Sequence, residues 1–112
     1  MLTDTRRIEF DADALVAAIA SSPRAADSLG LPRPAPYGAC FHPEQREVEF
    51  LYGTVRASRA VRLKAEVIGA FLVSYCLRER MPMPRNADRG VCIEANSVVL
   101  TLRTQLPRVM TW

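Results

Sequence analysis

The first thirty residues carry an apolar pattern that predicts two short helices. Apolar side chains recur at helical spacing between Asp11 and Ala20. Asp11 suits the N-cap position, because its carboxylate can accept hydrogen bonds from the free backbone N–H groups of the first turn. Pro23 fits the first turn of a second helix, which we expect to reach Leu29 and to end with Gly30 as its C′ residue.

Alternating apolar and polar side chains predict strands on both sides of these helices. Two apolar residues alternate with charged ones in residues 7–10, which favours a short edge strand. Residues 31–36 contain three prolines and are expected to form a stiff connector. Residues 37–52 alternate around the turn-rich segment 42–46. They predict a β-hairpin whose aromatic face, including Tyr37, lies toward the core.

Residues 60–80 give the strongest helical signal. Two adjoining apolar stripes at helical spacing form an arc wider than that of an ordinary surface helix. We expect the sheet to cover one side of this helix, and the N-terminal helix or a second subunit to cover the other. Gly69 costs up to about 1 kcal/mol relative to Ala in a helix, which close packing of another backbone would offset. The face from Gly69 to Leu77 is expected to be central to dimerisation or to the core.

The rest of the chain predicts a second hairpin and a tail. Pro82 and Pro84 end the long helix. Residues 91–103 alternate around the turn 94–97, and residues 104–112 form a loose tail. The expected fold is α+β: two short N-terminal helices, two β-hairpins joined as one four-stranded antiparallel sheet, and one long helix packed on the sheet.

Length and composition are those of one globular domain, residues 1–112. Apolar residues make up 49% of the 112 residues and charged residues 24%. These values exclude disorder, collagen and coiled coil as descriptions of the whole chain. Within the domain we expect a helical segment (1–30), a Pro-rich linker (31–36), a ββαββ core (37–103) and the tail (104–112).

Neither a membrane nor a secreted location is expected. The first twenty residues are rich in charge and lack the pattern of a signal peptide. The longest apolar stretch, residues 67–77, is too short to span a bilayer. The three cysteines, Cys40, Cys76 and Cys92, form no CxxC pair, and their odd number argues against a disulfide framework. We therefore expect a cytoplasmic protein with reduced, mostly buried cysteines.

Basic residues are concentrated in the second part of the chain. Residues 1–50 hold five arginines against eight acidic residues, whereas residues 51–112 hold ten basic residues against four acidic ones. Such a chain can pair its own halves, dimerise or bind an anionic partner. GC-rich coding would also explain the richness in arginine.

Four arginines around the end of the long helix are the predicted contact surface for an acidic partner: Arg78, Arg80, Arg85 and Arg89. The guanidinium group suits anion recognition. Cations at a helix C-terminus also interact favourably with the helix dipole, which is a purely structural reason for Arg78 and Arg80.

A second basic group precedes the same helix: Arg56, Arg59, Arg62 and Lys64. Positive charge at a helix N-terminus opposes the dipole and needs compensation. Glu66, another acidic residue of the chain or an external anion would supply it.

Candidates for catalysis are few. Cys40 and His42 would share one face of a strand, but a zinc site needs three or four ligands and a Cys–His dyad needs an orienting group. Glu47 and Glu49 are expected on a solvated strand face with arginine partners on the next strand. No cofactor is expected.

The prediction from sequence is therefore a small binding or accessory protein that acts through protein–protein contacts or self-association, without enzymatic activity. One alternative is a nucleic-acid-binding protein that uses the same arginines. The other is a minor enzyme or metal protein centred on Cys40 and His42.

Overall fold

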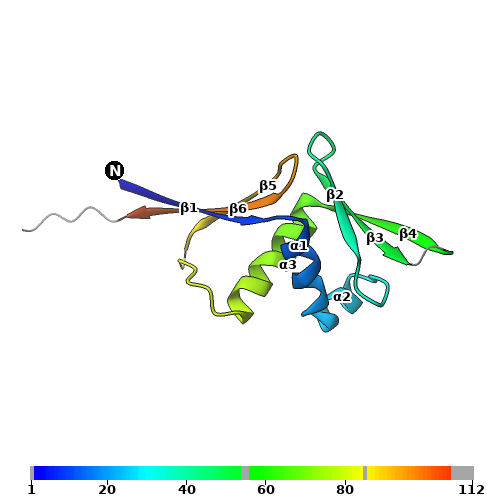
Figure 1. The fold of residues 1–112 in the computed structure, drawn as a ribbon. Helices are drawn as coiled ribbons and strands as arrows, with labels where there is room; N and C mark the ends of the chain where they lie inside the picture. Colours follow the sequence, from blue (N-terminus) through cyan, green and yellow to red (C-terminus); the bar gives the residue numbers. More distant parts are fainter. Residues whose placement is uncertain (1, 54–55, 85, 107–112) are drawn as a thin grey trace, which may run out of the picture.

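Two three-stranded antiparallel sheets lie side by side in this protein (Figure 1). The structure, a computed structural model, describes residues 2–53, 56–84 and 86–106. The first sheet has the strand order β1 (Leu2–Phe10), β6 (Val98–Leu106), β5 (Asp88–Ile93). The second has the order β2 (Gly38–His42), β3 (Glu47–Gly53), β4 (Ser58–Lys64).

Three helices of the described chain gather on one side of the two sheets in Figure 1: α1 (Ala12–Ala20), α2 (Pro23–Ser28) and α3 (Ala65–Arg78). The predicted α+β class is therefore correct. The local helix signals are confirmed as well. The Asp11 carboxylate accepts a hydrogen bond of 2.8 Å from the backbone N–H of Ala14, and Gly30, at φ +70°, follows α2 and its C-cap residue Leu29.

The predicted single four-stranded sheet is wrong. Both hairpins and both turns form where the alternation places them, but each hairpin acquires its own third strand. β1 pairs with β6 along its whole length, from Leu2 opposite Leu106 to Phe10 opposite Val98. β4 pairs with β3, so each sheet is complete without the other hairpin.

The long helix begins five residues later than predicted. Residues 58–64 form β4, in which Val61 and Leu63 are half-buried and alternate with exposed Arg62 and Lys64. The same two apolar residues also fit the helical spacing of the stripe that follows. Pairing of β4 with β3 decides between the two patterns, because it gives the backbone N–H and C=O groups of residues 58–64 hydrogen-bond partners. At the start of α3, by contrast, no side chain caps the helix.

Several segment boundaries and exposures also differ from expectation. The N-terminal segment contains a nine-residue strand, β1, and β6 extends to Leu106, so the predicted tail begins too early; residues 107–112 lie outside the described part. Tyr37 is 64% exposed and not in the core. All three cysteines are free, but only Cys76 is buried.

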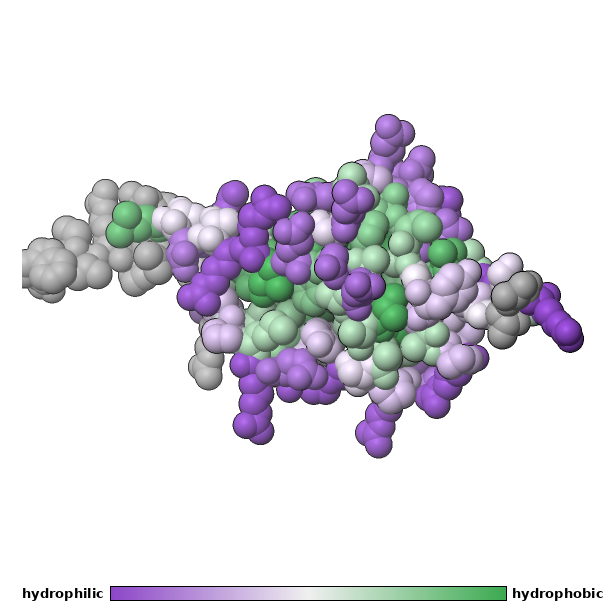
Figure 2. Space-filling model, viewed as in Figure 1, coloured by the Kyte–Doolittle hydropathy of each residue, from purple (hydrophilic) through white to green (hydrophobic). Residues whose placement is uncertain are grey.

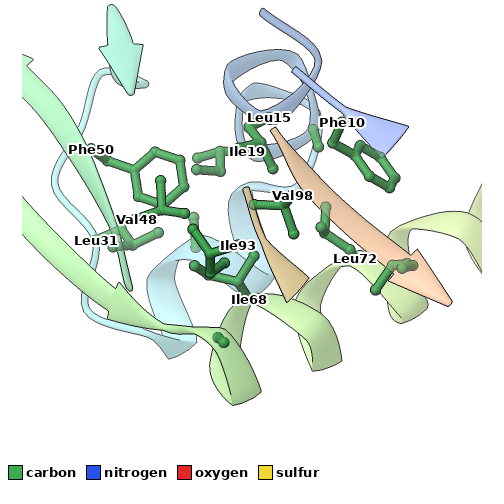
Figure 3. Close-up of a cluster of buried hydrophobic side chains, with 14 of the residues drawn as sticks. Phe10, Leu15, Ile19, Leu31, Val48, Phe50, Ile68, Leu72, Ile93 and Val98 are labelled. Atoms are coloured by element: carbon green, nitrogen blue, oxygen red, sulfur yellow. The ribbon is translucent and has the colours of Figure 1, made fainter. Parts of the chain in front are cut away.

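The hydrophobic core joins both sheets through the helices (Figure 3). Phe50 of β3, Leu15 of α1, Ile68 and Leu72 of α3 and Val98 of β6 are each at most 2% exposed. The buried side of α3 thus packs into the core, and its opposite side faces outward between β5 and α2.

Candidate functional site

The three predicted contact arginines that lie within the described residues have different surroundings. Arg78 donates a hydrogen bond to the hydroxyl of buried Ser22, between α1 and α2, and its guanidinium lies 5.6 Å from the centre of the Tyr75 ring. Arg89 is exposed on β5 and lines a groove beside α3. Arg80 is exposed just beyond α3, and Arg85 lies outside the described residues.

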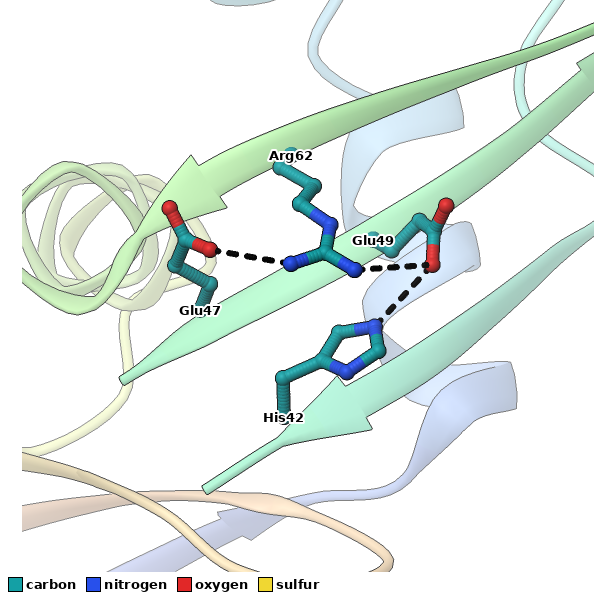
Figure 4. A network of polar contacts seen from close by, with 4 residues as sticks. All are labelled: His42, Glu47, Glu49 and Arg62. Carbon is teal, nitrogen blue, oxygen red and sulfur yellow. Dashed lines mark hydrogen bonds and ion pairs between the residues drawn. The ribbon is translucent and has the colours of Figure 1, made fainter. Parts of the chain in front are cut away.

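The outer face of the β2–β3–β4 sheet carries a network of charged side chains (Figure 4). Arg62 of β4 reaches the carboxylates of Glu47 at 3.3 Å and Glu49 at 3.9 Å. Glu49 also lies 3.0 Å from the Nε2 atom of His42. The predicted arginine partner for the two glutamates is confirmed. The positive charge of the guanidinium and the negative charges of the carboxylates offset one another, so these ion pairs stabilise the sheet.

Chemistry centred on Cys40 and His42 finds little support in this geometry. Cys40 is opposite Glu49 in the strand register, but the contact recorded for the His42 ring is with Glu49 and not with the thiol. Within the described ranges, no group of three His, Cys, Asp or Glu side chains is placed to hold a metal ion.

Part of the positive charge near the start of α3 is compensated within the chain. The guanidinium of Arg46 donates a 2.7 Å hydrogen bond to the carboxylate of Glu66 in the first turn of α3. A backbone hydrogen bond and, after it, the charge of Arg46 lower the pKa of the Glu66 carboxyl group. Arg62 is neutralised by Glu47 and Glu49 as described above. Of the four basic residues predicted before α3, Arg62 therefore needs no external anion, and Glu66 places a negative charge in the first turn of the helix.

The outward side of α3 is different, because it leaves apolar surface exposed. We call this surface the α3 face and define it by residues 66, 67, 70, 71, 73, 74, 77 and 78. Leu77 is 55% exposed and Ala70 is exposed, whereas Val67, Phe71 and Val73 are half-buried. Figure 2, which has the view of Figure 1, shows hydrophobic residues near the centre of the molecule and hydrophilic side chains that project around them.

One groove of about 480 Å³ runs between α3 and β5. Gly69 lines this groove. A Cβ atom at residue 69 would lie only 3.1 Å from a methyl group of Val91. Because residue 69 has no side chain, β5 can pack closely against the helix. The group that packs on Gly69 is the side chain of Val91, and not another backbone as the sequence suggested. Val73 and Leu77 line the helix side of the groove, and Arg89 adds a charge.

A second groove of about 570 Å³ runs between α3 and α2. Its walls are Val67 and Phe71 of α3 and Leu29, which is 38% exposed and follows α2. Ala70 and Glu66 line both grooves and thus form the ridge between them. The α3 face is therefore a ridge with an apolar groove on each side.

The sequence predicted only part of this surface. The face from Gly69 to Leu77 was expected to be central to dimerisation or to the core. Its residues differ in burial: Gly69, Leu72 and Cys76 are buried, whereas Ala70 and Leu77 are exposed. Nothing in the local pattern indicated that Leu29 and Val91 would form the outer walls. Those contacts depend on how α2 and β5 pack beside the helix.

None of the helices in the described ranges is long and apolar enough to cross a membrane. No protein-family model, no curated protein and no solved structure matches this chain.

Proposed function

We propose that this protein is a small binding or accessory protein that acts through protein–protein contacts, without enzymatic activity, and that the α3 face is its contact surface. The observation that carries the proposal is the exposed ridge of α3 with an apolar groove on each side of it. Contiguous exposed apolar surface of this kind, rimmed by charged residues, is typical of interaction sites.

The composition of the grooves favours a protein partner over a small ligand. Small-molecule sites are concave and contain several polar groups that converge on the ligand. The two grooves here are open and mainly apolar. Their charged residues are only Glu66, at the end of the ridge, and Arg89 of β5, and a few charged groups beside apolar surface are typical of protein interfaces.

The predicted arginine surface fits beside this site. Arg78 lies at the C-terminal end of the ridge and Arg89 on the β5 side of one groove. An acidic rim on the partner would pair with both. Arg80 and Arg85 remain predictions from the sequence.

An affinity capture from the native cell lysate tests the proposal. The baits are the wild-type chain, Ala70→Glu and Ala17→Glu, each assayed with and without nuclease. Both substitutions place a carboxylate at an exposed alanine of a helix, but only Ala70 lies on the α3 face. We expect a stoichiometric protein band, either another protein or the untagged native chain, to survive nuclease with wild type and Ala17→Glu and to be lost with Ala70→Glu.

Two results would contradict the proposal. Equal retention by all three baits would remove the α3 face as the contact surface. Loss of the captured proteins after nuclease would favour the nucleic-acid alternative. In that case affinity should fall with salt at a log–log slope of about −3.6 for four phosphate contacts, and replacing the four predicted arginines by Gln should abolish binding.

A further inference from the structure

The exposed ridge of α3 consists of four residues at four-residue spacing: Glu66, Ala70, Ser74 and Arg78. All four are exposed. Its two central residues are small and uncharged, and its two ends carry opposite charges. Side chains spaced by four residues form the ridges that most often interdigitate when two helices pack in globular proteins.

This ridge is complementary to itself in the antiparallel direction. Glu66 and Arg78 lie equally far along the helix from Leu72, and so do Ala70 and Ser74. Leu72 is 1% exposed, so the side of the helix opposite to it is the middle of the exposed face. A two-fold axis at the level of Leu72 therefore places each Glu66 beside the Arg78 of a second copy.

We propose that a second copy of this chain covers the α3 face, with the two α3 ridges packed antiparallel around this two-fold axis. This inference rests on the function proposed above and names the partner. Each ridge lies in a groove beside the ridge of the other copy, where Val67, Val73 and Leu77 supply apolar contact. A parallel arrangement would instead bring Glu66 to Glu66 and Arg78 to Arg78.

The charged ends of the ridge are available for this contact. The Arg78 guanidinium has five N–H donors, and its bond to Ser22 uses one of them. Glu66 and Arg46 are both exposed in their ion pair, and a carboxylate has about four acceptor sites, so Glu66 can accept a further hydrogen bond from a second partner. The antiparallel arrangement also aligns the dipoles of the two α3 helices favourably.

Charge reversal distinguishes this arrangement from other contacts. Glu66→Arg gives a ridge with two positive ends, and Arg78→Glu gives one with two negative ends. Either variant alone should dimerise about tenfold more weakly than wild type, because both symmetric ion pairs become repulsive. An equimolar mixture of the two variants should recover the wild-type affinity as a heterodimer, because both pairs are then of opposite charge.

The measurement is sedimentation equilibrium of the full chain from about 1 to 200 μM. Glu44→Arg and Arg103→Glu are the matched controls, since they make the same charge changes at exposed residues away from α3. Both controls should dimerise like wild type. Thermal melts show whether each variant is folded, which matters for Arg78→Glu because it replaces the donor to Ser22. Ala70→Glu, which leaves that bond intact, should be monomeric because it places a carboxylate in the middle of the contact.

Three results would overturn the inference: a monomeric wild type over the whole range, single variants as dimeric as wild type, or a mixture that does not recover. The capture experiment separates this failure from failure of the proposed function. A monomeric wild-type chain whose captured partner is lost with Ala70→Glu would leave the α3 face as a site for a different protein. Capture that is unaffected by Ala70→Glu would refute both.

Discussion

At the scale of single residues, Cys76 links burial to a measurable pH dependence. Its side chain has no exposed surface, and burial raises the pKa of the thiol above its ordinary value of 9.0. The folded protein therefore keeps this proton at a pH where the unfolded chain has lost it. The resulting stability is present below about pH 9 and is lost as the pH rises from there toward the folded-state pKa.

We expect the free energy of unfolding of the wild type to fall between about pH 8.5 and 10.5, and this fall to be shallower in Cys76→Ala. Urea unfolding at several pH values provides the measurement. Cys92→Ala is the control, because it removes an exposed thiol and leaves the buried one in place. Equal slopes in wild type and Cys76→Ala would show that the buried thiol does not titrate differently in the two states.

Arg62 gives a second prediction at this scale. Its guanidinium bridges two partly buried carboxylates that lie next to each other on one face of β3 and would otherwise repel each other. Arg62→Gln should destabilise the protein by about 1 kcal/mol at low salt, and the loss should shrink at high salt because the ion pairs are partly exposed. Arg24→Gln, at an exposed residue of α2, should have little effect. A salt-independent loss would instead indicate a packing effect.

Residues whose partners are close in sequence were the ones that the sequence predicted. The Asp11 cap acts within one helical turn, and the position of Gly30 follows from the end of α2. The bond from Arg78 to Ser22 spans more than fifty residues and depends on where α3 ends relative to the α1–α2 junction. No local pattern contains that information.

At the scale of elements, β4 shows where a periodic pattern becomes ambiguous. Val61 and Leu63 satisfy both a strand and the first turn of a helix, so only the pairing with β3 decides. The apolar arc of α3 is a similar case. The sequence indicated a helix covered on two sides, and the structure places only one of those sides in the core.

The contact between α3 and β5 depends on Gly69 and Val91 together. An alanine at 69 gains up to about 1 kcal/mol of helix propensity, but its Cβ would lie 3.1 and 3.2 Å from two Val91 atoms. Val91→Ala removes the methyl group at 3.1 Å and leaves only the Cβ atom at 3.2 Å, so in that background Gly69→Ala should be more favourable than in wild type by at least about 0.5 kcal/mol.

A double-mutant cycle measured by urea unfolding gives this coupling. The matched pair is Gly69→Ala with Val73→Ala, because Val73 lines the same groove from the helix side but is not among the atoms that meet the new Cβ. Coupling with Val91 but not with Val73 would identify the close approach of β5 as the reason for a glycine here. Additive effects in both pairs would exclude it.

At the scale of the whole molecule, the two ends of the described chain form one long ladder. β1 and β6 pair over nine positions, whereas β5 covers β6 only as far as Arg103. Pairing between segments so distant in sequence leaves no local signature, which is why the sequence suggested a single sheet built from the two hairpins. The polar outer residues of β1, from Thr3 to Arg7, also hid the length of the strand.

This arrangement predicts a gradient of stability along the ladder. Near Phe10 and Val98, β6 lies between two strands and packs on the core, but near Thr3 and Gln105 it has one partner only. Two-stranded ribbons are marginally stable in water. Backbone amides of residues 3–4 and 104–105 should therefore exchange hydrogen at least about 100-fold faster than those of residues 8–10 and 98–102.

Hydrogen exchange followed by NMR resolves this gradient, with residues 48–52 of β3 as the protected reference, because β3 is the central strand of the other sheet. Rapid exchange confined to the outer end would show that the ribbon opens without disturbing the core, as expected when only main-chain hydrogen bonds hold it there. Uniform protection along both strands would mean that the outer end opens only when the protein unfolds globally. The ladder would then be one cooperative unit, and its outer end would be held by contacts beyond the pairing of β1 with β6.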